Sequence, residues 1–122
     1  MIQTKRIYKD PAPSDGYRVL VDRLWPRGVS KERADLNEWL KDIAPSTELR
    51  KWYDHDPAKF AEFTEKYKTE LDANTEIVQG LLATAKEQAS KGENLTLLYA
   101  AKTPDNEAAV LKTYLEKKLD DA

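Results

Sequence analysis

The chain has 122 residues, of which 40% are hydrophobic and 34% charged, and a net charge of −2. This length suits one domain with a single core, and no apolar stretch approaches the roughly 20 residues that cross a bilayer. No apolar run follows the basic residues near the N-terminus, so we expect a cytoplasmic protein without membrane contact. The absence of cysteine excludes disulfides and thiolate chemistry, and a single histidine excludes a multi-histidine metal site.

The charge balance and the absence of nucleotide motifs limit the partners. A negative net charge has the wrong sign for a protein that binds nucleic acid mainly through phosphate contacts, so nucleic acid is not an expected partner. The sequence contains no P-loop, dinucleotide-binding glycine fingerprint or nucleophile elbow, and no carboxylate cluster suited to Mg²⁺ or Ca²⁺. We therefore predict neither a metal site nor an organic cofactor, and the oligomeric state is left open.

The first part of the chain predicts an opening strand at residues 2–8, near a sheet edge, and a central strand at residues 17–24. A turn-rich loop with two prolines and a glycine separates them. Trp25-Pro26-Arg27-Gly28 stops the central strand, because proline lacks an N–H and glycine permits a left-handed turn. Ser30 then caps a short helix that could reach Leu40. Residues 38–44 are ambiguous, and we favour the end of that helix followed by a strand-like 42–44.

The rest of the chain alternates helices with one further strand. Each predicted helix begins after a residue that can cap it or at a proline suited to the first turn. The expected starts are Ser46, Asp56-Pro57, Asn74 or Thr75, and Thr103 or Pro104; the second and third of these helices end near Leu71 and Gly92. Residues 94–101 are apolar on both faces, which predicts a second central strand. We therefore predict an α/β fold in which a small, largely parallel sheet is flanked by helices in a single compact domain over residues 1–122.

Charged side chains follow both predicted central strands. Asp22, Arg23 and Arg27 come after the first strand, and Lys102 comes after the second. Because parallel sheets bind ligands beyond the carboxyl ends of their strands, these residues are the candidate ligand site. Arginine and lysine suit a phosphate or carboxylate group, and Asp22 would orient Arg23. The alternative is a structural salt-bridge network with Lys102 simply solvated, because both arrangements give the same local charge pattern.

Aromatic residues and the one histidine complete the candidate set. Trp25 belongs to the ligand-site loop and could wall a pocket with Trp39 and Trp52, although large rings in a small domain more often anchor the core. His55 is the candidate for acid–base chemistry, because its ordinary pKa lies near neutrality. It stands in a corner between two predicted helices, which it could simply brace. No nucleophile–base pairing follows from the spacing, so the sequence leaves open whether the protein is an enzyme.

Three stretches resemble a known family. They are YRVLVDRLWPRG at residues 17–28, LRKWYDHDPAKFAEFTEKYKTEL at 49–71 and LTLLYAAKTPDNEAAVLKTYL at 95–115. The chain closely resembles the bacterial family called domain of unknown function 488, in its short YeaO-like branch, over nearly its whole length. The resemblance implies a compact cytoplasmic α/β protein and brings no established activity. Longer relatives carry a cysteine and an arginine after the last strand, similar to the phosphate-binding loop of rhodanese-like and tyrosine-phosphatase-like folds, whereas residues 98–107 here have neither.

These observations lead to three hypotheses. The first is an α/β domain that binds an anionic, phosphate- or nucleotide-like small molecule at the loops after the strands. The second is a non-catalytic protein-interaction module that uses the charged helix faces near residues 59–68 and 86–91. The third, ranked last, is an enzyme acting on nucleosides or DNA.

Overall fold

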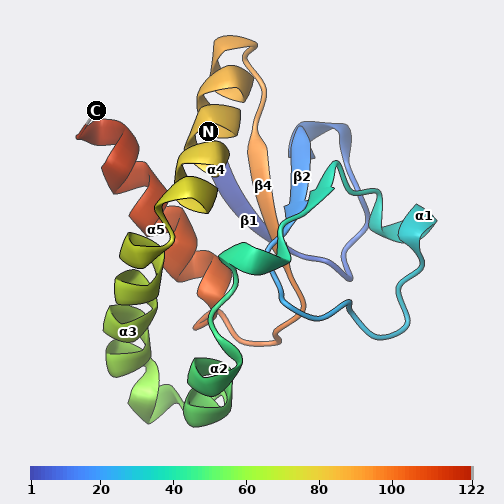
Figure 1. Ribbon diagram of the computed structural model, residues 1–122. Coiled ribbons are helices and arrows are strands. Elements are labelled where there is room, and N and C mark those ends of the chain that lie inside the picture. The colour runs from blue at the N-terminus through green and yellow to red at the C-terminus, as the bar shows by residue number, and fades with distance from the viewer. Residues whose placement is uncertain (122) are drawn as a thin grey trace.

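The computed structural model describes residues 1–121 and consists of a parallel sheet with helices packed against it (Figure 1). The strands are β1 (Ile2–Arg6), β2 (Tyr17–Leu20), β3 (Glu38–Trp39) and β4 (Leu95–Tyr99), in the spatial order β1-β4-β2-β3. All three pairings are parallel, with Leu95 opposite both Ile2 and Tyr17. The predicted α/β fold is confirmed, and the two strands predicted to be central are neighbours.

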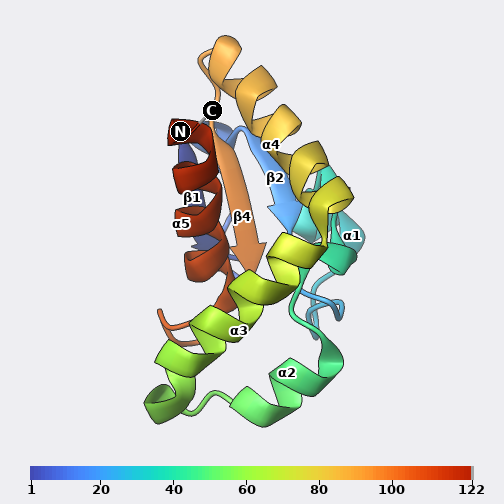
Figure 2. The same ribbon diagram turned by 60° about the vertical axis from the view of Figure 1, so that its left-hand side comes forward.

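The helices are α1 (Lys31–Ala34), α2 (Thr47–Tyr53), α3 (Phe60–Ala73), α4 (Thr75–Ser90) and α5 (Glu107–Asp120). Short 3-10 helices occupy Pro13–Asp15, Lys41–Ile43 and Pro57–Lys59. Figures 1 and 2 show α4 and α5 over one face of the sheet and α1 on the other side. In the described part of the chain, no helix combines the length and apolar character that a membrane span requires.

Alternation along the strands supplies two hydrophobic cores of unequal size. Val19 and Leu97 point to the larger core, which contains the apolar faces of α3, α4 and α5. Leu20 and Leu98 point the other way, into a small core completed by Ile7 and by residues in and before α1. Both central strands are therefore covered on both faces, as their continuous apolar runs predict.

The smaller face also contains a buried charge cluster, formed by Lys5, Asp15 and Arg18, which we call the closed cluster. Arg18 is only 3% exposed and forms an ion pair with Asp15, which also accepts from Lys5 Nζ at 3.0 Å. The Arg18 guanidinium donates to the carbonyls of Ala34 (2.7 Å) and Asp35 (2.9 Å). The cluster therefore fixes the end of α1 and the loop before β2 against the sheet.

The prediction for residues 38–44 is wrong in its order. The short helix ends at Ala34, Glu38–Trp39 form strand β3, and Lys41–Ile43 form a 3-10 helix where a strand-like segment was expected. The reason is pairing with β2: Asn37 accepts the Arg18 N–H through its side chain at 2.8 Å and donates its own N–H to the Arg18 carbonyl at 2.9 Å. Contacts distant in sequence decide this segment, whereas local spacing favours a helix.

The boundaries beside the strand ends also differ from the predictions. Strand β2 ends at Leu20 and β4 at Tyr99, which is earlier than the predicted 24 and 101. Helix α5 begins at Glu107, because Asn106 accepts the Ala109 N–H and caps it. Longer loops therefore leave the carboxyl ends of β2 and β4 than the sequence predicts.

Candidate functional site

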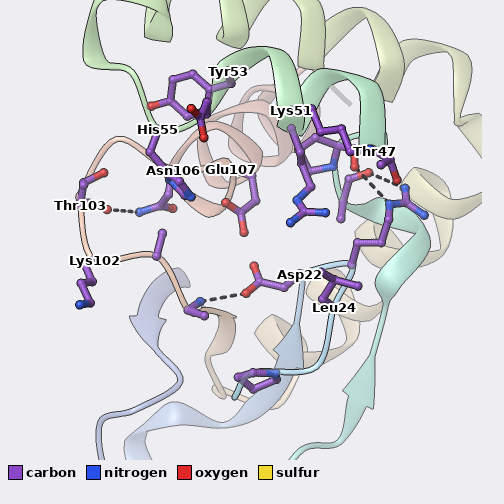
Figure 3. Close-up of a pocket in the computed structure, with 18 of the residues that line it drawn as sticks. Asp22, Leu24, Thr47, Lys51, Tyr53, His55, Lys102, Thr103, Asn106 and Glu107 are labelled. Atoms are coloured by element: carbon purple, nitrogen blue, oxygen red, sulfur yellow. Dashed lines mark hydrogen bonds between the residues drawn. The ribbon is translucent and has the colours of Figure 1, made fainter. Parts of the chain in front are cut away.

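A cleft of about 950 Å³ lies at the carboxyl ends of β2 and β4 (Figure 3). Three parts of the chain supply most of its lining, with Phe63 of α3 in addition: residues 22–27 after β2, residues from 44–55 around α2, and residues 100–107 from the end of β4 to the start of α5. All six candidates from the sequence are among its lining residues. They are Asp22, Arg23, Trp25, Arg27, His55 and Lys102.

Local capping and turn residues position these three wall segments. The Trp25 indole donates to the Val29 carbonyl at 2.6 Å and so closes the turn after β2. Ser46 caps α2 by accepting the Leu49 N–H at 3.1 Å. The Tyr53 hydroxyl at the other end of α2 donates to the Asp105 carbonyl at 2.9 Å, which joins α2 to the loop before α5.

Two carboxyl groups, those of Asp22 and Glu107, face one another inside the cleft (Figure 3). Asp22 Oδ2 accepts the Ala100 N–H at 2.9 Å, which ties the loop after β2 to the end of β4. Burial raises the pKa of Glu107 well above its ordinary value, and hydrogen bonding to Asp22 and the negative charge of Asp22 raise it further. Arg50 opposes this shift only in part. Glu107 therefore retains a proton in a pH range where ordinary glutamates have lost theirs.

The Arg23 side chain bonds mainly to the backbone of the segment before α2. Its guanidinium donates to the carbonyls of Ala44 at 3.1 Å and Pro45 at 3.2 Å, and lies 3.9 Å from the Asp42 carboxylate. The prediction that Asp22 orients Arg23 is wrong, because Asp22 bonds Ala100 instead. Arg23 fastens the segment before α2 to the loop after β2 while remaining on the cleft surface.

Four other cations line the cleft. Arg27 and Lys102 were predicted from the sequence, whereas Arg50 and Lys51 of α2 were missed. Within residues 1–121, none of the four has a carboxylate within 4 Å or a side-chain hydrogen bond to protein. Lys102 extends from the rim, away from the carboxyl pair (Figure 3). The LRKW stretch at residues 49–52 was the available sequence signal for Arg50 and Lys51. Whether these side chains face the cleft depends on how α2 docks, which the sequence alone does not give.

His55 stands at the corner after α2 and also lines the cleft. It follows Asp54 at the end of α2, and both residues have positive φ, at +55° and +46° respectively. The Asp56 N–H donates to the Tyr53 carbonyl at 2.9 Å, which completes the corner. The imidazole is exposed at the cleft, with its ring 6.1 Å from that of Tyr53. His55 can therefore contact a ligand at the rim.

The three tryptophans have separate positions. Trp25 lines the cleft and meets Trp39 edge to face, with 5.3 Å between the ring centres. Trp39 is 38% exposed and donates to the Asp22 carbonyl at 2.8 Å. Trp52 lies at the margin of the main core, under Lys59 and Lys66. Of the three predicted wall rings, only Trp25 lines the cleft, whereas the core-anchor interpretation fits both Trp52 at the larger core and Trp25 at the smaller one.

Charged side chains, and not a cluster of metal ligands, line the described part of the cleft. No group of three or more histidine, cysteine or acidic side chains suited to a metal ion occurs in residues 1–121. The cleft instead brings five cationic side chains and His55 together with three acidic ones, Asp22, Asp54 and Glu107. Such an arrangement can bind a small molecule through ion pairs and hydrogen bonds.

Comparison with known proteins establishes the family. The family described as the inactive DUF488-N3 subclade matches residues 1–122, and the chain belongs to it. The chain is 48% identical to the uncharacterized protein YeaO of Escherichia coli K12 over 115 residues, which cover 93% of this chain and 96% of that protein. It is 50% identical over 70 residues to the uncharacterized protein Rv3073c of Mycobacterium tuberculosis H37Rv, covering 57% and 59% of the two chains. No solved structure matches the chain with significance. The predicted family resemblance is confirmed.

Proposed function

We propose that this protein binds an anionic small molecule, phosphate- or nucleotide-like, in the cleft at the carboxyl ends of β2 and β4. The observation that carries the proposal is the set of four cations on the cleft that have no carboxylate partner within 4 Å in the described chain. They are Arg27, Arg50, Lys51 and Lys102. Cations on one concave surface attract an anion most strongly when no protein carboxylate already neutralises them.

The chemistry and size of the cleft support the same ligand class. A guanidinium presents a planar fork that can bond two oxygens of a phosphate at once, and a lysine adds a mobile point charge. A volume of about 950 Å³ lies within the ordinary range for small-molecule sites. Trp25 and Phe63 supply apolar wall against which the body of a ligand can lie.

The family description supports binding without turnover. The subclade is described as inactive, and the cleft offers no serine or cysteine nucleophile among its described lining residues. His55 and the Asp22–Glu107 pair serve in this proposal as polar contacts. The protein is then a binding module whose ligand is recognised at the loops after the strands.

The alternative of a charged protein-interaction face has less in its favour. Lysines of the helix faces near residues 59–68 and 86–91 pair with glutamates on their own helices. These pairs are Lys66–Glu62, Lys68–Glu65 and Lys91–Glu87. Such i,i+3 and i,i+4 pairs satisfy one another at a solvated surface. The unpaired cations of the cleft are therefore the better candidates for recognition.

The experiment is a titration of inorganic pyrophosphate at low salt, followed by tryptophan fluorescence and calorimetry. We expect the double variant Arg27→Gln, Arg50→Gln to lose at least about tenfold in affinity, which corresponds to about 1.4 kcal/mol. The matched control is Lys86→Gln, Lys117→Gln, which removes two exposed cations outside the cleft and should change the affinity less than twofold.

Two results would contradict the proposal. One is an equal loss of affinity in the cleft and control variants, which would mean that only the net charge matters. The other is no measurable binding of pyrophosphate or of simple organic phosphates to the wild-type protein. Thermal unfolding of each variant would verify that all are folded.

A further inference from the structure

The cleft separates charge of the two signs. The carboxyl groups of Asp22 and Glu107 face one another inside it, and Lys102 extends away from them (Figure 3). Arg27 lines the cleft from the loop after β2, and Arg50 is the cation that acts on Glu107. A ligand that carried only negative charge would use the cations and be repelled by ionised carboxylates. The acidic pair is therefore suited to a different part of the ligand, one that carries no negative charge.

The environment of Glu107 contrasts with that of the buried carboxylate elsewhere in this protein. Asp15 receives hydrogen bonds from Lys5, Arg18 and the Ala12 N–H. The Glu107 carboxyl forms no salt bridge within residues 1–121, and its own backbone N–H and the positive charge of Arg50 favour its ionised form only in part. Buried carboxylates are normally paired. Glu107 has no pairing cation in contact within the described chain and lines the cleft, where a ligand can reach it.

We propose that the Asp22–Glu107 pair recognises a positively charged amino group, so that the ligand is a zwitterion whose amino group lies between these carboxyls and whose phosphate lies against the cleft cations. This inference rests on the proposed function and deepens it, because it names the class of anion. Aminoalkyl phosphates are the simplest members of that class.

A neutral hydroxyl is a poorer occupant than an ammonium group. In the free protein, burial and the neighbouring Asp22 carboxyl raise the pKa of Glu107, because a second negative charge beside Asp22 is unfavourable. A hydroxyl brings no charge and leaves that repulsion in place. An ammonium group donates to both carboxylates and also cancels the repulsion between two negative charges held close together. The pair therefore favours a cation over a polyol.

Binding of the amino group has a proton balance that can be measured. When an ammonium group enters, Glu107 ionises and its proton passes to the solvent, so that both carboxylates become charged. The other charged and titratable groups that act on the pair or lie beside it are Arg23 from the loop after β2, Arg50 and Tyr53 from α2, Tyr67 from α3 and Asp105 before α5. The tyrosines keep their protons at neutral pH, because burial raises the pKa of each above its ordinary value.

The test compares two matched pairs of ligands by calorimetry at pH 7: phosphoethanolamine against ethyl phosphate, and 3-aminopropyl phosphate against propyl phosphate. We expect at least one amino compound to bind about tenfold more tightly than its match, because it adds charge-assisted hydrogen bonds. Repeating the titration in buffers of different ionisation enthalpy should show more protons released with the amino compound than with its matched alkyl phosphate. Glycerol 3-phosphate tests the hydroxyl alternative and should bind no more tightly than the plain alkyl phosphates.

The variant Glu107→Gln keeps the shape of the side chain and removes its charge. In this variant we expect the preference for the amino compounds to fall below twofold and their excess proton release over the matched alkyl phosphates to disappear. Equal binding within both ligand pairs, or tighter binding of glycerol 3-phosphate, would overturn the inference while leaving the proposed function intact. Absence of binding by all five phosphates would overturn the proposed function, and the inference with it. Thermal unfolding would verify the fold of the variant.

Discussion

The two charged regions at opposite ends of β2 differ in how completely their groups are bonded. In the closed cluster, Arg18 bonds one carboxylate and two carbonyls, and Asp15 in turn has several donors. In the cleft, Arg27 has no carboxylate partner within 4 Å in the described chain, and the acidic Asp22 beside Glu107 is only partly offset by Arg50. Residue types of the same kind thus serve structure at one end of the strand and remain available at the other.

This difference shows why charge at a strand end cannot by itself be assigned to function. A buried cation is stable only when its donors are satisfied, and the fold satisfies Arg18 by wrapping a loop and α1 around it. Arg23 is intermediate, because it bonds two carbonyls and still borders the cleft. Unsatisfied groups around a concave surface are the better evidence for a ligand.

The largest expected effect comes from opening the closed cluster. Arg18→Met should lower the free energy of unfolding by about 3 to 5 kcal/mol, because it leaves the Asp15 carboxylate buried with fewer partners and frees the buried Ala34 carbonyl and the partly buried Asp35 carbonyl. Urea denaturation followed by circular dichroism measures this change. Arg27→Met is the matched control and should stay within about 0.5 kcal/mol of the wild type. Similar losses in the two variants would remove the distinction between the regions.

A smaller loss is expected at the intermediate arginine. Arg23→Ala should cost about 1 to 2 kcal/mol in urea denaturation, because two hydrogen bonds to the Ala44 and Pro45 carbonyls are lost at a half-exposed site. Arg23→Lys keeps the positive charge without the planar fork. This variant should keep the pyrophosphate affinity of the wild type more fully than it keeps the wild-type stability. Full recovery of stability with lysine would show that charge alone, and not the paired carbonyl bonds, determines the role of Arg23.

The smallest expected effect is a difference between Asp15 and Glu107 in how pH changes their contribution to the stability of the fold. Burial favours a raised pKa at Asp15, but hydrogen bonds from Ala12, Lys5 and Arg18 outweigh it and lower the pKa below the ordinary 3.8. Asp15 therefore stabilises the fold above that value, and this contribution is lost as the pH falls through its pKa in the folded state. The pKa of Glu107 is raised, so its ionisation destabilises the fold as the pH rises above the ordinary value of 4.5.

The effect of pH on stability through Glu107 can be measured with a single substitution. Glu107→Gln should be at least as stable as the wild type at neutral pH, and its advantage should vanish as the pH falls toward 4.5. Urea denaturation of both proteins between pH 3 and pH 8 gives the comparison. A variant that is less stable than the wild type at neutral pH would contradict the raised pKa of Glu107.

The sequence predicts the parallel sheet and the location of the cleft because these depend on short-range patterns. The apolar runs around Val19 and Leu97 indicate covered strands, and the turn at Pro26 ends the first of them. Parallel strands with covered faces place their following loops at one edge of the sheet. Arg27 and Lys102 could be found by this argument alone.

What the sequence does not predict depends on contacts between distant segments. Arg50 joins the cleft because α2 docks beside the loop that contains Asp105, and no local pattern specifies this docking. Asp22 was expected to bond its neighbour in sequence, but the Ala100 N–H, 78 residues away, is its partner. Glu107 looks like an ordinary residue in the first turn of a helix. Only the approach of β2 to β4 reveals that a second carboxyl faces it.

The hydrogen bond between Asp22 and the Ala100 N–H connects the acidic pair directly to the main chain leaving β4. Any change of charge or position at this aspartate alters the electronic surroundings of that amide, which therefore acts as a built-in spectroscopic reporter. A nitrogen–proton correlation spectrum can follow this one peak to register occupancy of the neighbouring hollow, without a label attached to the ligand.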